Sequence, residues 1–307
     1  MSKQIKFLFC LLICGFSGVS CSTIKKPFYW KIEKDGKTSY VLGTMHRGID
    51  VRDLPKELHE DLALSSAVLL EITTQSEKEN PPFYKMGPKG TKNLFKKYKH
   101  IIEKNIENNI TVNDFFSAEQ WSKIEKRIHD FGIKQSIAKN LTLQMINAIV
   151  TDRKTVVVPR YEYSLYTTKS MDGEIEKKAL QSKKPLYRLD TLQRMKPACW
   201  EKMWVKSIIF YLDNDTYDVI GNITKAVDVY RSGDADQMTE QMEFLDRELH
   251  KCLLVERNAR WVPVIDGHHK NESPVFIAAG ALHFIGEGNV LELLEKLGYK
   301  IQRFPFK

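Results

Sequence analysis

Short apolar runs separated by polar turns predict that this chain forms a β-sheet. The runs Phe28-Tyr-Trp-Lys-Ile-Glu33 and Thr38-Ser-Tyr-Val-Leu42 flank Asp35-Gly36, a pair that suits the positive dihedral angles of a hairpin turn. Further apolar runs, each bounded by polar or turn-forming residues, predict strands at 67–70, 185–190, 274–280 and 299–304.

Helical spacing of apolar residues fills most of the intervals between these strands. Leu54, Leu58 and Leu62 predict one helix, and Ser117 with Gln120 forms a capping-box pattern that predicts another. Long helices are expected from about 192 to 262 and a last one at 290–297, whereas 77–109 reads as an irregular, Lys-rich insertion. We therefore predict one α/β domain of two pseudo-symmetric halves, with a mixed β-sheet and a helical middle.

Two strand-like runs end in the same short motif. Gly43-Thr-Met-His46 follows the second strand of the predicted hairpin, and Gly280-Ala-Leu-His283 follows the run at 274–280. A Gly-x-x-His string is expected about 0.4 times by chance in a chain of this composition. Because open α/β sheets gather their ligands at the carboxyl ends of the strands, both histidines are candidate site residues.

The first twenty residues are typical of a secretory signal peptide. Lys3 and Lys6 give a positive start, and the apolar stretch 7–16 is too short to span a bilayer. Gly18-Val-Ser-Cys21 resembles a bacterial lipobox without its usual leucine, which makes Cys21 a candidate for lipidation and leaves simple cleavage near Ser20 as the alternative. The expected order is a signal peptide at 1–20, a lipidated tether at 21–27 and the domain at 28–307. The expected location is the bacterial cell envelope, as a membrane-anchored lipoprotein or a periplasmic protein.

Charge and cysteine content narrow the possible partners. The formal charge of +8 falls by two when the signal peptide leaves, and an exported protein of this modest charge is not expected to bind nucleic acid. The membrane is expected as a partner through the N-terminal lipid. Beyond Cys21, the mature chain keeps Cys199 and Cys252, which either form a disulfide in an oxidising compartment or remain two core thiols.

A carboxylate at a third strand end completes a candidate metal site. Glu71 follows the apolar run 67–70 and should lie on the same edge as His46 and His283. Imidazole and carboxylate ligands suit a divalent ion such as manganese, cobalt or zinc, and three protein ligands leave room for a water. Glu71 is a candidate for either the third ligand or the general base, and Arg257 is a candidate for holding a substrate carboxylate or a developing oxyanion.

Each of these residues also has a purely structural interpretation. A histidine beside a strand end is often a structural residue, Glu71 could cap a turn, and Arg257 could form an ion pair. We expect Asp172 to cap a helix, and His268 and His269 to be solvated in a polar turn.

The ordered motifs of the chain resemble those of the TraB/GumN superfamily, which includes the Wnt-cleaving TIKI proteases. The resemblance runs from about Phe28 to the C-terminus and is carried by Tyr40-Val-Leu-Gly-Thr-Met-His46, Leu69-Leu-Glu71, Met171-Asp172, Tyr230-Arg-Ser-Gly-Asp234, Glu256-Arg-Asn258 and Ala279-Gly-Ala-Leu-His283. It implies a fold like that of the erythromycin esterases and the haem-binding lipoprotein ChaN. Asp190 departs from the pattern, because it stands where the superfamily commonly has glutamate.

The resemblance also implies an activity. His46, Glu71 and His283 match the family's metal site, and Arg257 and Asn258 match its neighbouring motif. We therefore expect a metal-dependent hydrolase acting on a peptide or another small molecule, metalloprotease-like, with a divalent ion as cofactor. The alternative is an envelope lipoprotein that binds haem or a peptide without turnover.

Overall fold

The computed structural model describes residues 23–46, 48–71, 99–151, 170–190, 197–214, 219–240 and 246–306. The predicted signal peptide and Cys21 lie outside the described residues, as does most of the predicted insertion at 77–109. None of the helices in the described ranges has the length and apolar character needed to cross a bilayer.

The described chain is built around one mixed sheet of six strands in the order β4-β3-β5-β2-β1-β6. The strands are β1 (Tyr29–Lys34), β2 (Lys37–Thr44), β3 (Ala67–Leu70), β4 (Leu186–Arg188), β5 (Val275–Gly280) and β6 (Lys300–Arg303). Strands β4, β3, β5 and β2 pair in parallel, whereas β1 is antiparallel to both β2 and β6. The carboxyl ends of the four parallel strands therefore share one edge.

Helices make up most of the remaining described chain. The eleven α-helices found there are α1 (Lys56–Leu64), α4 (Lys99–Glu107), α5 (Ala118–Asp130), α6 (Leu143–Thr151), α8 (Met171–Gln181), α9 (Pro197–Asp213), α10 (Val219–Ser232), α11 (Ala235–Glu240), α12 (Arg247–His250), α13 (Glu256–Glu272) and α14 (Val290–Lys296). A π-helix, Lys251–Val255, joins α12 to α13. Short 3-10 helices lie at Val51–Asp53, Asn113–Phe115, Gln135–Asn140 and Ala281–His283.

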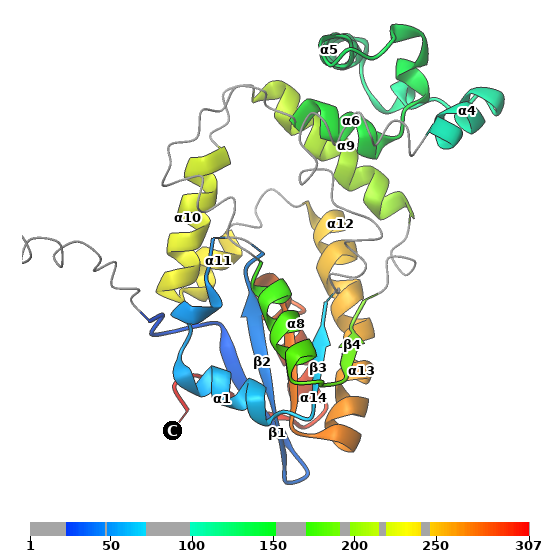
Figure 1. The fold of residues 1–307 in the computed structure, drawn as a ribbon. Coiled ribbons are helices and arrows are strands. Elements are labelled where there is room, and N and C mark those ends of the chain that lie inside the picture. The colour runs from blue at the N-terminus through cyan, green and yellow to red at the C-terminus, as the bar shows by residue number, and fades with distance from the viewer. Residues whose placement is uncertain are drawn as a thin grey trace, which may run out of the picture.

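The helices form two groups, each with its own hydrophobic cluster. Helices α1 and α8 lie on one face of the sheet and α13 and α14 on the other, and together they bury the first cluster around strands β2, β3 and β5. Helices α4, α5, α6 and α9 bury the second cluster and lie beyond the carboxyl ends of the parallel strands (Figure 1). The predicted α/β class, mixed sheet and helical middle are confirmed.

Several local predictions can be compared with the structure. The hairpin is confirmed, with φ of 53° at Asp35 and 73° at Gly36, and so is the capping box of Ser117 and Gln120 at the start of α5. The prediction of an irregular stretch up to residue 109 is wrong for residues 99–107, which form α4. The expectation of a solvated turn at His269 is also wrong: this residue lies in α13, is 1% exposed, and bonds the Ser39 hydroxyl and the Lys34 carbonyl.

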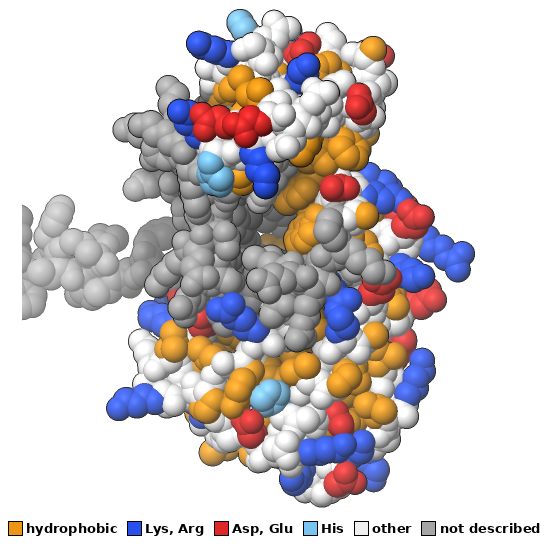
Figure 2. All heavy atoms as spheres, turned by 90° about the vertical axis from the view of Figure 1, so that its right-hand side faces the viewer, with side chains coloured by type: hydrophobic (Ala, Val, Ile, Leu, Met, Phe, Trp, Pro, Cys, Tyr) orange, Lys and Arg blue, Asp and Glu red, His pale blue; other side chains and the backbone are white. Residues whose placement is uncertain are grey.

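Charged side chains of both signs are interspersed with small apolar areas on the face shown in Figure 2. The described side chains there form no continuous surface of one charge.

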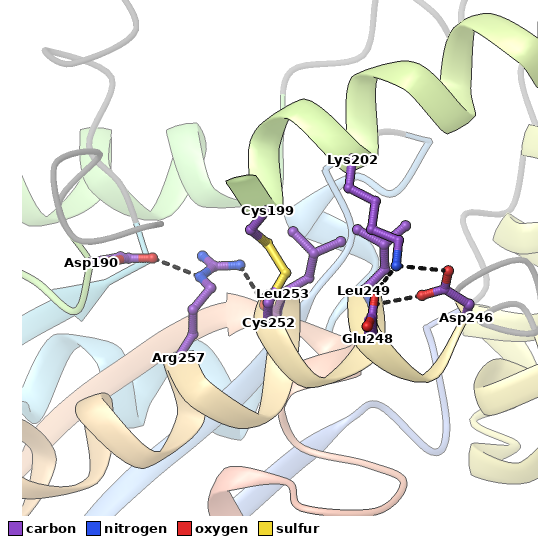
Figure 3. The surroundings of a disulfide bond; sticks show 9 residues. All are labelled: Asp190, Cys199, Lys202, Asp246, Glu248, Leu249, Cys252, Leu253 and Arg257. Carbon is purple, nitrogen blue, oxygen red and sulfur yellow. Dashed lines mark hydrogen bonds and ion pairs between the residues drawn. A yellow bond between two sulfur atoms is a disulfide. The ribbon is translucent and has the colours of Figure 1, made fainter. Parts of the chain in front are cut away.

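A disulfide joins Cys199 near the start of α9 to Cys252 in the π-helix, across 53 residues (Figure 3). Of the two alternatives left open by the sequence, the structure has the paired form. In the loop-entropy description, a cross-link that closes a loop of this length lowers the conformational entropy of the unfolded chain. This stabilises the folded state by about 4 kcal/mol.

Reducing this disulfide is expected to lower the free energy of unfolding by about 2–4 kcal/mol. Urea unfolding monitored by circular dichroism, with and without a phosphine reductant, measures the difference. The double variant Cys199→Ser/Cys252→Ser is the control and should be insensitive to the reductant. Equal stability of the reduced and oxidised proteins would contradict the expectation.

Candidate functional site

The predicted site residues meet at the shared carboxyl edge of the parallel strands. His46 lies two residues after β2, Glu71 directly follows β3, and His283 ends the 3-10 helix that follows β5. Strand β5 lies between β2 and β3, so the three segments are neighbours in the sheet. The backbone N–H of Glu71 continues the β3–β5 pairing by donating to the Ala278 carbonyl at 3.2 Å.

Gly280, the last residue of β5, marks the point where the three side chains converge. A Cβ placed on this glycine would lie 3.6 Å from Glu71 Oε2, 3.8 Å from His283 Cδ2 and 3.9 Å from His46 Nε2. Side chains from three separate strand ends therefore face one small space, which is kept open by the lack of a side chain on Gly280.

His46 is held in place by the first turn of α8. Its Nδ1 lies 3.0 Å from Asp172 Oδ2, and the Thr44 hydroxyl donates to Asp172 Oδ1 at 2.7 Å. The prediction that Asp172 caps this helix is wrong, because the Ser170 hydroxyl caps it by accepting from the Gly173 N–H. Asp172 is thus free of a capping role and orients the imidazole, whose Nε2 lies on the Gly280 side.

His283 is buried and has a defined tautomer. Asn258 donates its amide N–H to the Gly288 carbonyl at 2.9 Å, so its Oδ1 is left to accept from His283 Nδ1 at 2.6 Å. The proton of the neutral imidazole then sits on Nδ1, and Nε2 carries the lone pair. Trp261 packs on the ring with 4.2 Å between centroids, which fixes the ring plane.

Arg257 bonds two of the acidic side chains at this edge, Glu71 and Asp190. Its guanidinium donates from Nη2 to Glu71 Oε1 and from Nε to Asp190 Oδ2, the latter at 2.6 Å. All three side chains are almost fully buried. The other Glu71 oxygen accepts from the Gly280 backbone N–H at 3.2 Å. Glu71 is therefore bonded through both of its oxygens.

The charges of the site follow from this arrangement. Burial alone would raise the pKa of Glu71, but His283 in its protonated form and Arg257 outweigh burial and hold that pKa well below the usual range of a glutamate. Burial lowers the pKa of His283 in spite of the nearby Glu71, which favours the neutral ring at neutral pH. Burial would also lower the pKa of Arg257, but Glu71 and Asp190 raise it overall, so the guanidinium stays charged.

The donor chemistry of the site fits a divalent metal ion. Both histidines bond through Nδ1, to a carboxylate and to an amide oxygen, and direct Nε2 toward the edge with Glu71, as metal-binding histidines commonly do. Within the described ranges, however, no three His, Cys, Asp or Glu side chains are already arranged as a metal site. The residue types and their orientation suit a divalent ion.

Several contacting residues were not predicted from the sequence. Trp261 stands four residues after Arg257 on α13, a spacing that places both on one helix face, and this spacing was the available signal. Thr44 lies inside the first Gly-x-x-His motif, and a hydroxyl two residues before the candidate ligand His46 was the signal. Nothing in the local sequence indicates that the Leu253 carbonyl accepts from Arg257 Nη1 at 3.1 Å (Figure 3).

The fold and this edge define an α/β protein with a histidine- and carboxylate-lined site at the carboxyl ends of its parallel strands. The model of the TraB/PrgY/gumN family matches residues 28–303, so the chain belongs to that family. No curated protein and no solved structure matches the chain.

Proposed function

We propose that this protein is a metal-dependent hydrolase of the bacterial cell envelope that cleaves peptides, with His46, Glu71 and His283 holding a divalent ion. One observation carries the proposal: the three side chains converge at Gly280, and both histidines are oriented by a bond from their other ring nitrogen. The envelope location depends on the N-terminal signal peptide and the lipidation of Cys21. The finer fold prediction, an erythromycin esterase/ChaN-like arrangement of two related halves, belongs to the same proposal.

The contacts of Glu71 support a ligand role more than a base role. A bound manganese, cobalt or zinc ion would lower the pKa of a water and polarise the scissile carbonyl. A general base works best with a pKa near the working pH, whereas the pKa of Glu71 is held well below its usual range. Glu71 is thus a poor proton acceptor and a good anionic ligand.

Arg257 and Asn258 support the site from α13. Asn258 keeps the proton of His283 on Nδ1 and leaves Nε2 for coordination. Arg257 places a permanent positive charge beside Glu71, where it could stabilise the oxyanion that forms when a carbonyl is attacked. The two residues thus have separate tasks, one in orienting a ligand and one in balancing charge.

Replacing either histidine is expected to abolish both ion binding and hydrolysis. Loss of a ligand should weaken the affinity for manganese, cobalt or zinc by at least about 100-fold, because even removal of a supporting partner costs 10–100-fold. Elemental analysis of protein purified without chelator, isothermal titration with each ion and a peptide library measure this for His46→Ala and His283→Gln. His46 is well exposed, so its alanine variant should fold normally.

His129→Ala is the matched control, because this histidine is exposed on α5 and away from the edge. A wild-type protein that carries no metal, binds none and cleaves no peptide would refute the proposal. A haem Soret shift that is lost in the histidine variants, without hydrolysis in the wild type, would favour the binding alternative instead.

A further inference from the structure

One guanidinium contacts two of the three proposed metal ligands at the same time. Arg257 Nη2 donates to Glu71 Oε1, and Nη1 lies 3.3 Å from His283 Nε2. His283 Nε2 is the ring nitrogen with the lone pair, so it accepts from Nη1. These two acceptor atoms lie 3.7 Å apart. The arginine engages the single lone pair of His283 Nε2 and one lone pair of Glu71 Oε1.

The remaining contacts of Arg257 would hold the side chain close to the site even without these two bonds. Asp190 accepts from Nε at 2.6 Å, and the indole of Trp261 lies under the guanidinium with 5.0 Å between Cζ and the ring. The Leu253 carbonyl of the π-helix accepts from Nη1, directly beside the disulfide-bonded Cys252 (Figure 3). None of these three contacts involves Glu71 or His283.

We propose that Arg257 is an internal cation that closes the candidate metal site, and that it must release Glu71 and His283 before either of them binds an ion. Arginine and ion then compete for the same two atoms, so binding of the one opposes binding of the other. This inference rests on the proposed function.

Release would give Arg257 a second state with a use in catalysis. Asp190 and Trp261 retain the side chain at the edge, while Nη1 and Nη2 become available to an incoming anionic group. Planar guanidinium bonds carboxylates through two parallel N–H groups. The site would therefore take substrates with a carboxylate close to the scissile bond, and it would take them after the ion.

Arg257→Met is expected to bind manganese at least about tenfold more tightly than the wild type, because the competing charge-assisted bonds are removed. Arg257→Lys keeps the charge but lacks the fork, so its affinity should stay closer to the wild-type value. The measurements are isothermal titration with Mn²⁺ and the ion-induced rise in melting temperature, both at pH 8 after chelator treatment. The rise should be larger in Arg257→Met than in the wild type, even if that variant is less stable without the ion.

Arg247→Gln is the matched control. Arg247 is exposed in α12, just before the π-helix, and its replacement removes the same charge as Arg257→Met does. It should bind Mn²⁺ with the wild-type affinity. Tryptophan fluorescence gives an independent readout. The guanidinium lies beside the Trp261 ring, so its release from Glu71 should change the surroundings of that indole. Mn²⁺ should alter the emission of the wild type but not that of Trp261→Phe.

The outcomes separate this inference from the proposed function. If the wild type binds Mn²⁺ and Arg257→Met binds it equally or more weakly, Arg257 does not block the site. The proposed metal site is then still supported. Failure of both proteins to bind any divalent ion overturns both proposals. Tighter binding in Arg257→Met together with an unchanged Arg247→Gln supports the competition.

Discussion

Glu71→Gln is expected to lose about 3 kcal/mol of the free energy of unfolding at pH 7.5, together with ion binding and hydrolysis. Glu71 is a buried carboxylate whose two oxygens accept from Arg257 and from the Gly280 backbone. Removing one partner of a buried ion pair leaves the other charge poorly compensated, and such losses are of the order of 3–5 kcal/mol. Asp190 still pairs with Arg257 in the variant, which places the expected loss at the lower end.

The pH dependence of this loss has a definite sign. The pKa of Glu71 is lowered in the folded protein, so its stabilising contribution is fully present above the ordinary pKa of 4.5. That contribution disappears as the pH falls from about 4.5 through the lower folded pKa. The gap between wild type and Glu71→Gln should therefore be constant near neutral pH and shrink in acid.

Urea unfolding in the presence of chelator, at pH 7.5 and at steps below pH 5, measures both effects. Glu60→Gln is the control, because Glu60 is an exposed partner of Lys56 on α1 and should change the stability by less than about 1 kcal/mol. A Glu71→Gln protein as stable as the wild type at pH 7.5 would show that the buried ion pair contributes nothing to the fold.

The strands and their ends could be predicted well from the sequence, because short local patterns of apolar and turn-forming residues determine them. The hairpin turn needs positive φ angles at Asp35 and Gly36, and the apolar run at 67–70 is buried along its whole length. The two Gly-x-x-His motifs follow strands as expected. Their strands are neighbours in parallel register, with Gly43 opposite Ala279, which no local pattern encodes.

The partners of the site residues were harder to predict, because they are far away along the chain. Asp172 lies 126 residues from His46, and its place in the first turn of a helix favoured the wrong interpretation as a cap. Arg257 lies 186 residues from Glu71. The π-helix before it has the apolar pattern of an ordinary helix, so periodicity could not reveal the extra residue in that turn.

His269 shows why polarity along the chain can mislead. Asp266-Gly267-His268-His269-Lys270 has the composition of a turn, yet it forms part of α13. The helix is stabilised there by tertiary contacts, since His269 is enclosed between the Ser39 hydroxyl and the Lys34 carbonyl. Tertiary burial overrides local preference at this position.

The two motif glycines have different surroundings, which predicts opposite outcomes for the same substitution. A Cβ on Gly43 would lie 2.9 Å from both Ala281 Cα and Phe28 Cβ, closer than packed atoms allow. Gly43→Ala is therefore expected to lower the free energy of unfolding by about 1–3 kcal/mol through overpacking. A Cβ on Gly280 would make only ordinary contacts, and its φ of −48° is accessible to alanine.

Gly280→Ala is expected to keep or slightly raise the stability, by up to about 1 kcal/mol, because alanine restricts the unfolded chain. Its methyl group would nevertheless occupy the space between Glu71 Oε2 and His46 Nε2, where the proposed ion and substrate would lie. Displacement of reacting groups by about 1 Å can cost on the order of 100-fold in rate. We therefore expect hydrolysis to fall by at least that factor, with a parallel loss of Mn²⁺ affinity.

Urea unfolding and Mn²⁺ titration of the two alanine variants, side by side, test this contrast. The pair forms its own control, because both changes add one methyl group to the glycine of the same motif. A Gly43→Ala protein that is destabilised yet binds Mn²⁺ as the wild type does, beside a stable Gly280→Ala protein that does not bind it, is the expected result. Normal Mn²⁺ affinity in Gly280→Ala would mean that the space at the end of β5 holds no ion, because a methyl group there would then be tolerated.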